Sequence, residues 1–152
     1  MIRIIAVGKV KEKALQSLIA DYTKRLNHYH KTVIREVDDF ADTKELNYAV
    51  NKEAELIIKN LTAEDYVILL DLRGETTDSL TFAKRLENWQ SHHANLTFII
   101  GGSQGVSQKV YQRADYVWQL SPLTFPHQLV RLLLLEQLYR AATISKGQRY
   151  HK

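Results

Sequence analysis

Two short stretches of the chain are apolar almost throughout, and they restrict the possible folds more than any other feature. Tyr66–Leu70 and Leu96–Ile100 consist mainly of valine, leucine, isoleucine and aromatic residues. A strand with one face in water alternates apolar and polar positions, whereas a strand covered on both faces is continuously apolar, as in parallel sheets. The two stretches therefore predict an α/β fold with a mainly parallel sheet and helices on both faces.

Helical periodicity separates the strand-like segments along the whole chain. Strands are expected at Arg3–Val7, Thr32–Val37, Tyr66–Leu70, Leu96–Ile100 and Tyr116–Leu120. Helices are expected at Glu12–Leu26, Thr43–Asn60, from Asp78 or Ser79 to about Gln90, at Ser107–Ala114 and at His127–Ser145. Loops are expected at Leu72–Asp78 and Ser121–Pro126. In a chain of 152 residues without a linker or repeat, this alternation predicts one domain, residues 1–152.

Composition excludes several kinds of site. The chain has no cysteine, which rules out disulfides, a thiolate nucleophile and cysteine-ligated metals. His28, His30, His92 and His93 stand in polar stretches without spaced carboxylates, so we expect surface histidines and no metal site. The apolar run Leu132–Leu135 is far shorter than the roughly 20 residues that cross a bilayer. The N-terminal residues 1–8 are too short and wrongly ordered for a signal peptide, so we expect none. We expect a soluble, cytoplasmic protein that is not associated with a membrane.

The positive charge of the chain is concentrated at its C-terminal end. Residues 1–125 contain 16 lysines and arginines against 16 acids, whereas residues 126–152 contain five basic residues against the single acid Glu136. A local cationic surface favours an anionic partner, of which nucleic acid is the usual one. A solvated basic tail without a partner is the alternative on charge alone.

Three loops are expected at the same edge of the sheet, because ligands in parallel sheets bind beyond the carboxyl ends of the strands. These loops follow Leu70, Ile100 and Leu120. The second of them contains glycines at 101, 102 and 105, where a backbone can approach a ligand closely next to a helix N-terminus. The spacing is neither the dinucleotide-binding fingerprint nor a P-loop, and a plain tight turn explains the glycines equally well.

The loop Ser121–His127 carries both prolines of the chain, four residues apart. A stiff backbone lined by the apolar side chains of Leu123 and Phe125 suits a flat heterocycle held by main-chain hydrogen bonds. The loop is also a plausible helix start, with Thr124 as the cap and Pro126 in the first turn.

The last predicted helix is apolar nearly all round, which requires cover on most of its faces. A subunit interface supplies such cover, and so does a central position in the core. Glu136 and Arg140 are spaced to pair on one face of this helix. The tail after it, Gly147–Lys152, is either a frayed end or an RNA-contacting arm whose His151 can accept a proton near neutral pH.

Several motifs together resemble the RlmH-type ribosomal RNA methyltransferases, which belong to the SPOUT class. They are Gly101-Gly102-x-x-Gly105, Ser121-x-x-Thr124-x-Pro126-His127, Glu136-Gln137-x-Tyr139-Arg140-Ala141 and the terminal Tyr150-His151-Lys152, with Ala6–Lys9 and Leu70-Asp71 as further matches. Each motif is short, but their order and spacing extend over the full chain.

The resemblance implies a homodimer with a trefoil knot in its C-terminal half. It also implies S-adenosylmethionine as methyl donor, without a metal, and N3 of a pseudouridine as acceptor. That pseudouridine is at position 1915 of 23S rRNA, in the assembled ribosome. An enzyme of the same class that acts on another RNA, such as a tRNA, is one alternative. A ribosome-associated nucleotide-binding factor without activity is another.

Carried onto this chain, the resemblance also implies site residues. The donor-binding residues are Leu70, Gly101, Leu120, Ser121, Pro122, Leu123, Thr124 and Phe125. The catalytic residues are His151, Tyr150, Arg140 and Glu136. His151, or Tyr150 acting through it, accepts the N3 proton in one reading, whereas Arg140 stabilises the charge that develops on the flanking carbonyls in the other. Glu136 holds Arg140 in both.

Overall fold

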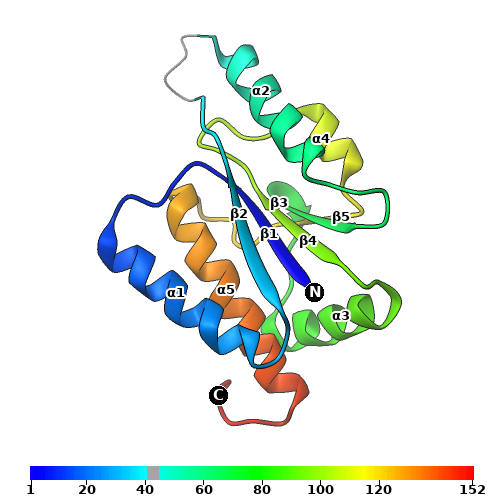
Figure 1. Cartoon of the computed structure of the whole chain (residues 1–152). Coiled ribbons are helices and arrows are strands. Elements are labelled where there is room, and N and C mark those ends of the chain that lie inside the picture. The colour runs from blue at the N-terminus through cyan, green and yellow to red at the C-terminus, as the bar shows by residue number, and fades with distance from the viewer. Residues whose placement is uncertain (41–44) are drawn as a thin grey trace.

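The structure is a computed structural model of the chain that describes residues 1–40 and 45–152. Strands and helices alternate along it (Figure 1): β1 (Ile2–Val7), α1 (Lys13–Asn27), β2 (Thr32–Val37), α2 (Leu46–Lys59), β3 (Tyr66–Glu75), α3 (Ser79–His92), β4 (Leu96–Ile100), α4 (Gln108–Arg113), β5 (Tyr116–Trp118) and α5 (His127–Ser145). The expected helix at Thr43–Asn60 corresponds to α2, and residues 43 and 44 of that prediction lie outside the described residues.

The five strands form one sheet in the order β2-β1-β4-β3-β5, and every neighbouring pair is parallel. The prediction of an α/β fold with a mainly parallel sheet is therefore confirmed. All positions of β4, in the centre of the sheet, are buried. This position explains why Leu96–Ile100 is nearly continuously apolar.

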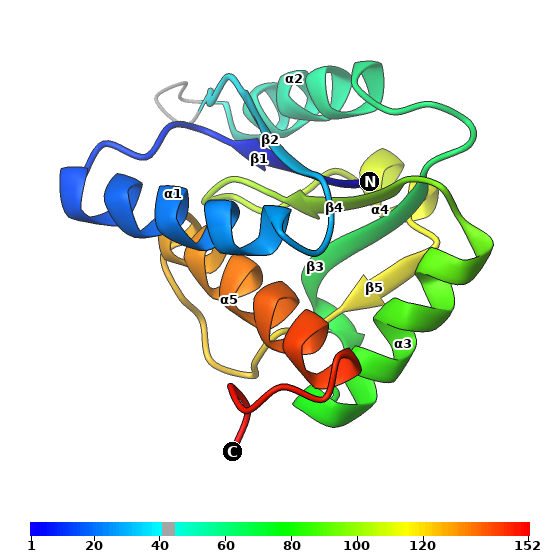
Figure 2. The same ribbon diagram turned by 60° about the horizontal axis from the view of Figure 1, so that its bottom comes forward.

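Helices cover both faces of the sheet, as predicted (Figures 1 and 2). Ile2, Ile4 and Ala6 of β1 share a core with α1, α3 and α5, while Ile5 and Val7 share a core with α2 and α4. Side chains of a strand point alternately to opposite faces, so β1 supplies apolar residues to both cores. Among the described residues, no helix is long and apolar enough to cross a membrane.

The predicted loop at Leu72–Asp78 is wrong in its first half, because β3 continues to Glu75. The register between β3 and β5 is irregular here: Leu70 and Glu75 of β3 both pair with Trp118 of β5. The backbone N–H of Gln119 donates to the carbonyl oxygen of Glu75 at 2.9 Å, which secures the extension. Apolar and polar residues do not alternate regularly in this extension, so the sequence pattern did not predict a strand there. The strand β5 ends at Trp118, two residues earlier than predicted.

Gly74 permits this extension because the β3 backbone lies directly on β5 at this point. A Cβ atom at Gly74 would lie 2.5 Å from the carbonyl carbon and oxygen of Val117, which are backbone atoms that cannot move aside. We predict that Gly74→Ala lowers the free energy of unfolding by about 3 kcal/mol, the upper part of the range for overpacking. Urea unfolding at fixed protein concentration measures this effect. Thr76 is exposed close to Gly74, so Thr76→Ala is the control. Equal urea midpoints for the two variants would contradict the prediction.

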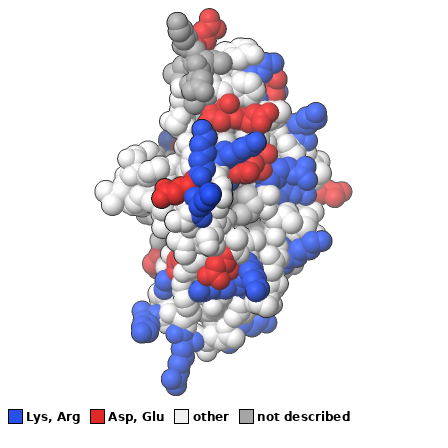
Figure 3. Space-filling model, turned by 60° about the vertical axis from the view of Figure 1, so that its left-hand side comes forward, with Lys and Arg blue, Asp and Glu red and all other residues white. Residues whose placement is uncertain are grey.

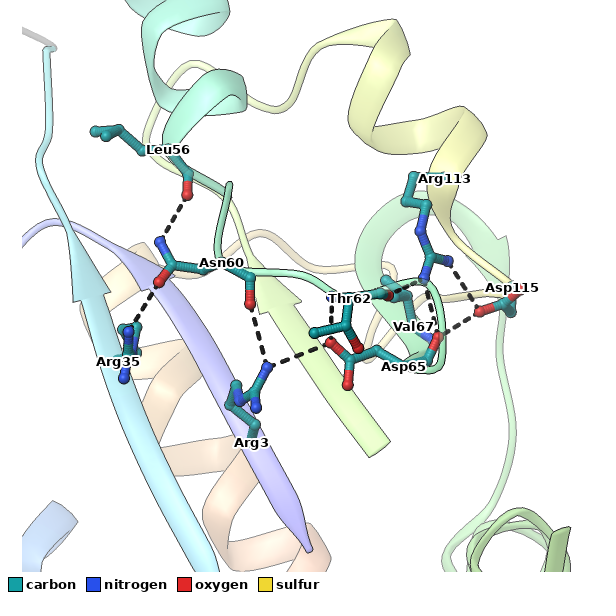
Figure 4. Close-up of polar contacts among 9 residues, drawn as sticks. All are labelled: Arg3, Arg35, Leu56, Asn60, Thr62, Asp65, Val67, Arg113 and Asp115. Carbon is teal, nitrogen blue, oxygen red and sulfur yellow. Dashed lines mark hydrogen bonds and ion pairs between the residues drawn. The ribbon is translucent and has the colours of Figure 1, made fainter. Parts of the chain in front are cut away.

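A polar network closes the amino-terminal edge of the sheet (Figure 4). Arg3 Nη1 donates to the Asn60 carbonyl oxygen at 3.1 Å and pairs with Asp65 Oδ2 at 3.3 Å. Arg113 Nη2 donates to the carbonyl oxygens of Thr62 and Asp65, each at 3.0 Å. These contacts fix the connection between α2 and β3.

Candidate functional site

The first cavity of interest lies at the carboxyl end of β4 and beside residues 70–72 of β3, and we call it the strand-end cavity. It has a volume of about 440 Å³. Of the predicted donor-binding residues, Leu70, Gly101, Thr124 and Phe125 line it. Leu70 pairs with Ile100 across β3 and β4, which places it directly beside Gly101. The structure thus brings Leu70 of β3 and residues of the two loops that follow β4 and β5 to one cavity.

The glycine loop after β4 is a tight turn that also lines this cavity. Gly105 N–H donates to the Gly102 carbonyl oxygen at 3.1 Å, and Gly105 has a φ of +85°, which glycine adopts without strain. A Cβ atom on Gly101 would lie 2.6 Å from Val106 Cγ1. A side chain at position 101 would therefore have to displace the Val106 side chain, apart from any effect on a ligand.

A second cavity, of about 560 Å³, adjoins the first at Phe125, which lines both. We call it the tail cavity, because His151 of the C-terminal tail lines it together with Leu120 and Ser121. The predicted donor residues are thus divided between two adjoining cavities. Pro122 and Leu123 line neither, and Leu123 is 69% exposed.

The helix α5 begins two residues later than the expected cap at Thr124. Thr124 does not cap α5; Pro126 occupies the N-cap position and provides no side-chain cap hydrogen bond. Its carbonyl oxygen accepts from the N–H groups of Leu129 and Val130, at 2.9 and 3.1 Å. Because the Thr124 side chain is not used as a cap, it is available to the strand-end cavity.

The four predicted catalytic residues form one hydrogen-bonded cluster. Arg140 Nε and Nη2 donate to Glu136 Oε1 at 3.0 and 2.5 Å, so the expected pair is present. Tyr150 donates its hydroxyl to the same oxygen at 3.1 Å. Arg140 Nη1 lies 3.1 Å from His151 Nδ1. The tail is therefore held against α5 by specific contacts, and a frayed end does not describe it.

Protonation states in the cluster follow from these contacts. Burial, reinforced by the hydrogen bond with Tyr22 and the charge of Glu136, raises the pKa of Tyr150, which therefore stays a phenol. Hydrogen bonds to Glu136 raise the pKa of Arg140. A guanidinium has donors only, so His151 Nδ1 must accept from Arg140, and the proton of a neutral His151 is then on Nε2.

Several residues in contact with the cluster were not predicted from the sequence. Tyr22 of α1 lies with its hydroxyl 3.1 Å from that of Tyr150, although 128 positions separate the two. Gln137 donates from Nε2 to Glu136 Oε2 at 2.9 Å, and Ser79 Oγ donates to Gln137 Oε1 at 3.2 Å. Gln137 stands within the motif of Glu136 and Arg140, which is the only signal that the sequence offered. Tyr22 and Ser79 carried no such signal in the sequence, because only the tertiary fold brings them close to this cluster.

The other predictions have mixed outcomes. His28 and His92 are exposed as expected, but His30 and His93 are half-buried; burial lowers the pKa of His30, and His93 stacks on Tyr66 at 4.4 Å between ring centroids. Within residues 1–40 and 45–152, no group of three or more histidines, aspartates or glutamates is arranged to hold a metal ion.

The helix α5 occupies the central position that one of the two sequence readings proposed. Leu134, Leu135 and Leu138 are buried in the core between α1 and α3, while Leu132 and Leu133 are half-buried. A subunit interface over the remaining apolar surface stays a prediction.

Comparisons with known proteins match the whole chain. The family model described as "Predicted SPOUT methyltransferase" matches residues 1–151. Proteins named "Ribosomal RNA large subunit methyltransferase H" are 47% identical in Alkaliphilus oremlandii, 46% in Ruminiclostridium cellulolyticum and 44% in Halothermothrix orenii, and each alignment covers 99% of both chains.

Solved structures include a protein of similar fold, "a probable methylase family protein from Haemophilus influenzae Rd KW20". It aligns with a TM-score of 0.55 and 15% identity, over 99% of this chain and 70% of that one. At this identity the likeness concerns the fold alone.

Proposed function

Because this chain belongs to the SPOUT methyltransferase family, we propose that it transfers a methyl group from S-adenosylmethionine to a ribosomal RNA. The acceptor in this proposal is N3 of the pseudouridine at position 1915 of 23S rRNA, in the assembled ribosome of the cytoplasm. Relatives of 44 to 47% identity carry the name of a large-subunit ribosomal RNA methyltransferase. The observation that carries the proposal is the meeting of the loop 120–125 and the tail residue His151 at one cavity.

The strand-end cavity fits the methyl donor. Its volume of about 440 Å³ lies in the range of small-molecule sites, roughly 300 to 1,000 Å³. Gly101 and Gly102 present backbone without side chains, and Leu70, Thr124 and Phe125 add apolar and hydroxyl surface. When bound, S-adenosylmethionine supplies a methyl group already activated by its sulfonium, so the reaction needs no metal. In this proposal Leu70, Gly101 and residues 120–125 would hold it, with Leu120 and Ser121 contributing from the adjoining tail cavity.

The catalytic cluster acts on the base by electrostatics in this proposal. The base gives up its N3 proton to solvent and gains the methyl group in its place, and negative charge develops on the carbonyls beside N3. His151 presents Nε2–H, because its Nδ1 accepts from Arg140. Donors aimed at developing charge stabilise the transition state. Tyr150 is a phenol that donates to Glu136, so it positions Glu136 and Arg140 and is not the proton acceptor.

The RNA partner is supported by the distribution of charge. On the face shown in Figure 3, lysine and arginine alternate with acids over the upper part, and basic side chains predominate at the lower end, where the C-terminus lies in Figure 1. The excess of five basic residues over one acid in residues 126–152 agrees with this picture. We assign Arg149 and Lys152 to phosphate contacts, which weaken as salt rises.

We also propose a homodimer. Leu18 of α1 is 47% exposed, and it borders an apolar cavity shared with Leu15 and with Leu129 and Leu132 of α5. Two-fold dimers are the commonest assembly, and an exposed apolar surface of this kind is a natural interface.

Sedimentation velocity at micromolar protein is expected to show a dimer. Leu18→Glu is expected to yield a monomer, because burying a carboxylate at the interface is unfavourable. The exposed Lys24→Glu serves as a control on the same helix. A wild-type monomer with full activity would contradict the dimer.

Methyl transfer from labelled S-adenosylmethionine to whole ribosomes, separated subunits and bulk tRNA tests the proposed function. The proposal predicts labelling of whole ribosomes only. Labelling of tRNA indicates another RNA substrate, and donor binding without any transfer indicates a factor that binds the nucleotide but is not an enzyme.

A further inference from the structure

The strand-end cavity contains one acid. Among the described residues that line it, Asp71 is the only aspartate or glutamate, and the others offer apolar side chains, glycine backbone, hydroxyls and one imidazole. Asp71 forms an ion pair with Arg73, which does not line the cavity. The Asp71 side chain is 14% exposed and that of Arg73 is 50% exposed. The carboxylate is therefore the inner member of the pair, and the guanidinium is the outer one.

Arg73 holds this carboxylate in a fixed orientation. Its Nε donates to Asp71 Oδ1 at 2.8 Å, its Nη2 donates to Oδ2 at 3.1 Å, and its backbone N–H donates to Oδ1 at 2.9 Å. The guanidinium lies over the ring of Tyr111 on α4, at 4.0 Å from the ring centroid. The hydrogen bonds from Arg73 lower the pKa of Asp71, so the group is a carboxylate at neutral pH. Arg73 thus links the cavity wall to the helix that follows the glycine loop.

The bonding capacity of Asp71 is not exhausted by Arg73. A carboxylate offers about four lone-pair sites, two on each oxygen. Arg73 occupies both sites of Oδ1 and one of Oδ2, so Oδ2 keeps one site without a partner among the described residues. Because the guanidinium already neutralises the carboxylate, the remaining site suits a neutral O–H donor better than a second cation. Surface ion pairs add little to stability, so stability alone does not account for this arrangement.

We propose that Oδ2 of Asp71 accepts a hydrogen bond from one ribose hydroxyl of the methyl donor, and that Arg73 and Tyr111 position Asp71 for this contact. This inference rests on the proposed use of S-adenosylmethionine. In other nucleotide-binding folds with parallel sheets, a carboxylate likewise accepts from a ribose hydroxyl. A donor without that hydroxyl would leave the carboxylate site unpaired inside the occupied cavity, which is unfavourable. Asp71 would therefore select a ribonucleoside over its deoxy analogues.

Calorimetry with S-adenosylhomocysteine and its 2′-deoxy and 3′-deoxy analogues tests the inference without RNA and without turnover. The wild type is expected to bind one of the two analogues about 10- to 100-fold more weakly than S-adenosylhomocysteine, the scale of a hydrogen bond to a charged group. Asp71→Ala is expected to lose the same factor for S-adenosylhomocysteine. It is also expected to bind that analogue and S-adenosylhomocysteine equally well, because the hydroxyl no longer has its partner.

Variants of the supporting residues separate the contact from its positioning. Arg73→Gln and Tyr111→Leu keep the carboxylate but release its orientation, so each is expected to weaken binding less than Asp71→Ala does and to keep part of the discrimination. The matched control is Asp21→Ala, which removes an exposed aspartate–arginine pair of 2.9 Å on α1 and is expected to leave the affinity unchanged. Thermal unfolding of each variant checks its fold.

Two results would overturn the inference. One is wild-type affinity of Asp71→Ala for S-adenosylhomocysteine, and the other is a folded Asp71→Ala protein that discriminates against the deoxy analogues as strongly as the wild type. A wild type that binds no S-adenosylhomocysteine would refute the proposed function and this contact together. A protein that binds it through Asp71 but transfers no methyl group to RNA would refute the proposed function and keep the contact.

Discussion

Deleting residues 149–152 is expected to reduce methyl transfer to ribosomes by at least about a hundredfold, the scale of losing preorganised donors at a reacting centre. The deletion removes His151 from the tail cavity and Tyr150 from Glu136. The strand-end cavity keeps all of its lining residues. Donor affinity, measured by calorimetry, is therefore expected to remain that of the full chain.

Point variants separate the roles that the deletion combines. His151→Ala removes the Nε2–H donor and is expected to lower kcat strongly. Tyr150→Phe keeps the ring packed on Tyr139 at 4.7 Å but loses the hydrogen bonds with Glu136 and Tyr22, so a moderate loss is expected. Arg149→Ala is expected to raise the KM for ribosomes with a weaker salt dependence, since it removes a phosphate contact.

Thermal unfolding of each tail variant provides the control for folding. Near-wild-type methylation of ribosomes at low salt by the truncated chain would show that the tail has no part in the reaction.

Replacing Gly101 by valine is expected to abolish measurable binding of S-adenosylmethionine. Gly101 lines the strand-end cavity directly after β4, and a side chain there has no free space within the loop. A side chain at such a glycine keeps the backbone away from the ligand, and no other residue replaces the lost contacts. Calorimetry measures the affinity, and circular dichroism compares the fold with that of the wild type.

The contact with Val106 supplies a matched control for this prediction. A Cβ on Gly101 meets Val106 Cγ1 at 2.6 Å, so a defect in Gly101→Val could arise from packing within the loop. Val106→Ala removes the obstructing methyl groups. If Gly101 faces the donor, the double variant Gly101→Ala/Val106→Ala still binds poorly while Val106→Ala alone binds well. Restored affinity in the double variant would show that the glycine serves the turn only.

Local sequence patterns predict most of this fold because each element carries its own periodicity. The strand β4 is recognisable from a nearly continuous apolar run, and α3 from Phe82, Leu86 and Trp89 on one face, all of which are buried. The extension of β3 to Glu75 escaped prediction because it depends on the fit of Gly74 against Val117, a contact between distant segments.

The candidate site was predictable only in part, for a related reason. Loops at the carboxyl ends of parallel strands meet by topology, and this rule alone is enough to place Leu70 near Gly101. No such rule connects α1 or the start of α3 with the tail. Tyr22 and Ser79 join the cluster through the packing of α1 and α3 on either side of α5. A trefoil knot in the C-terminal half is an implication of the family and was not indicated by any pattern of the residues.

The position of the methyl group on the RNA tests the central claim most directly. Ribosomes that lack the modification are treated with the protein and S-adenosylmethionine, and mass spectrometry of rRNA digests then locates the new methyl group. The account predicts one methyl group on N3 of a single pseudouridine in 23S rRNA, and none with the chain lacking residues 149–152. A methyl group on a ribose, on an exocyclic amine or in another RNA would contradict it.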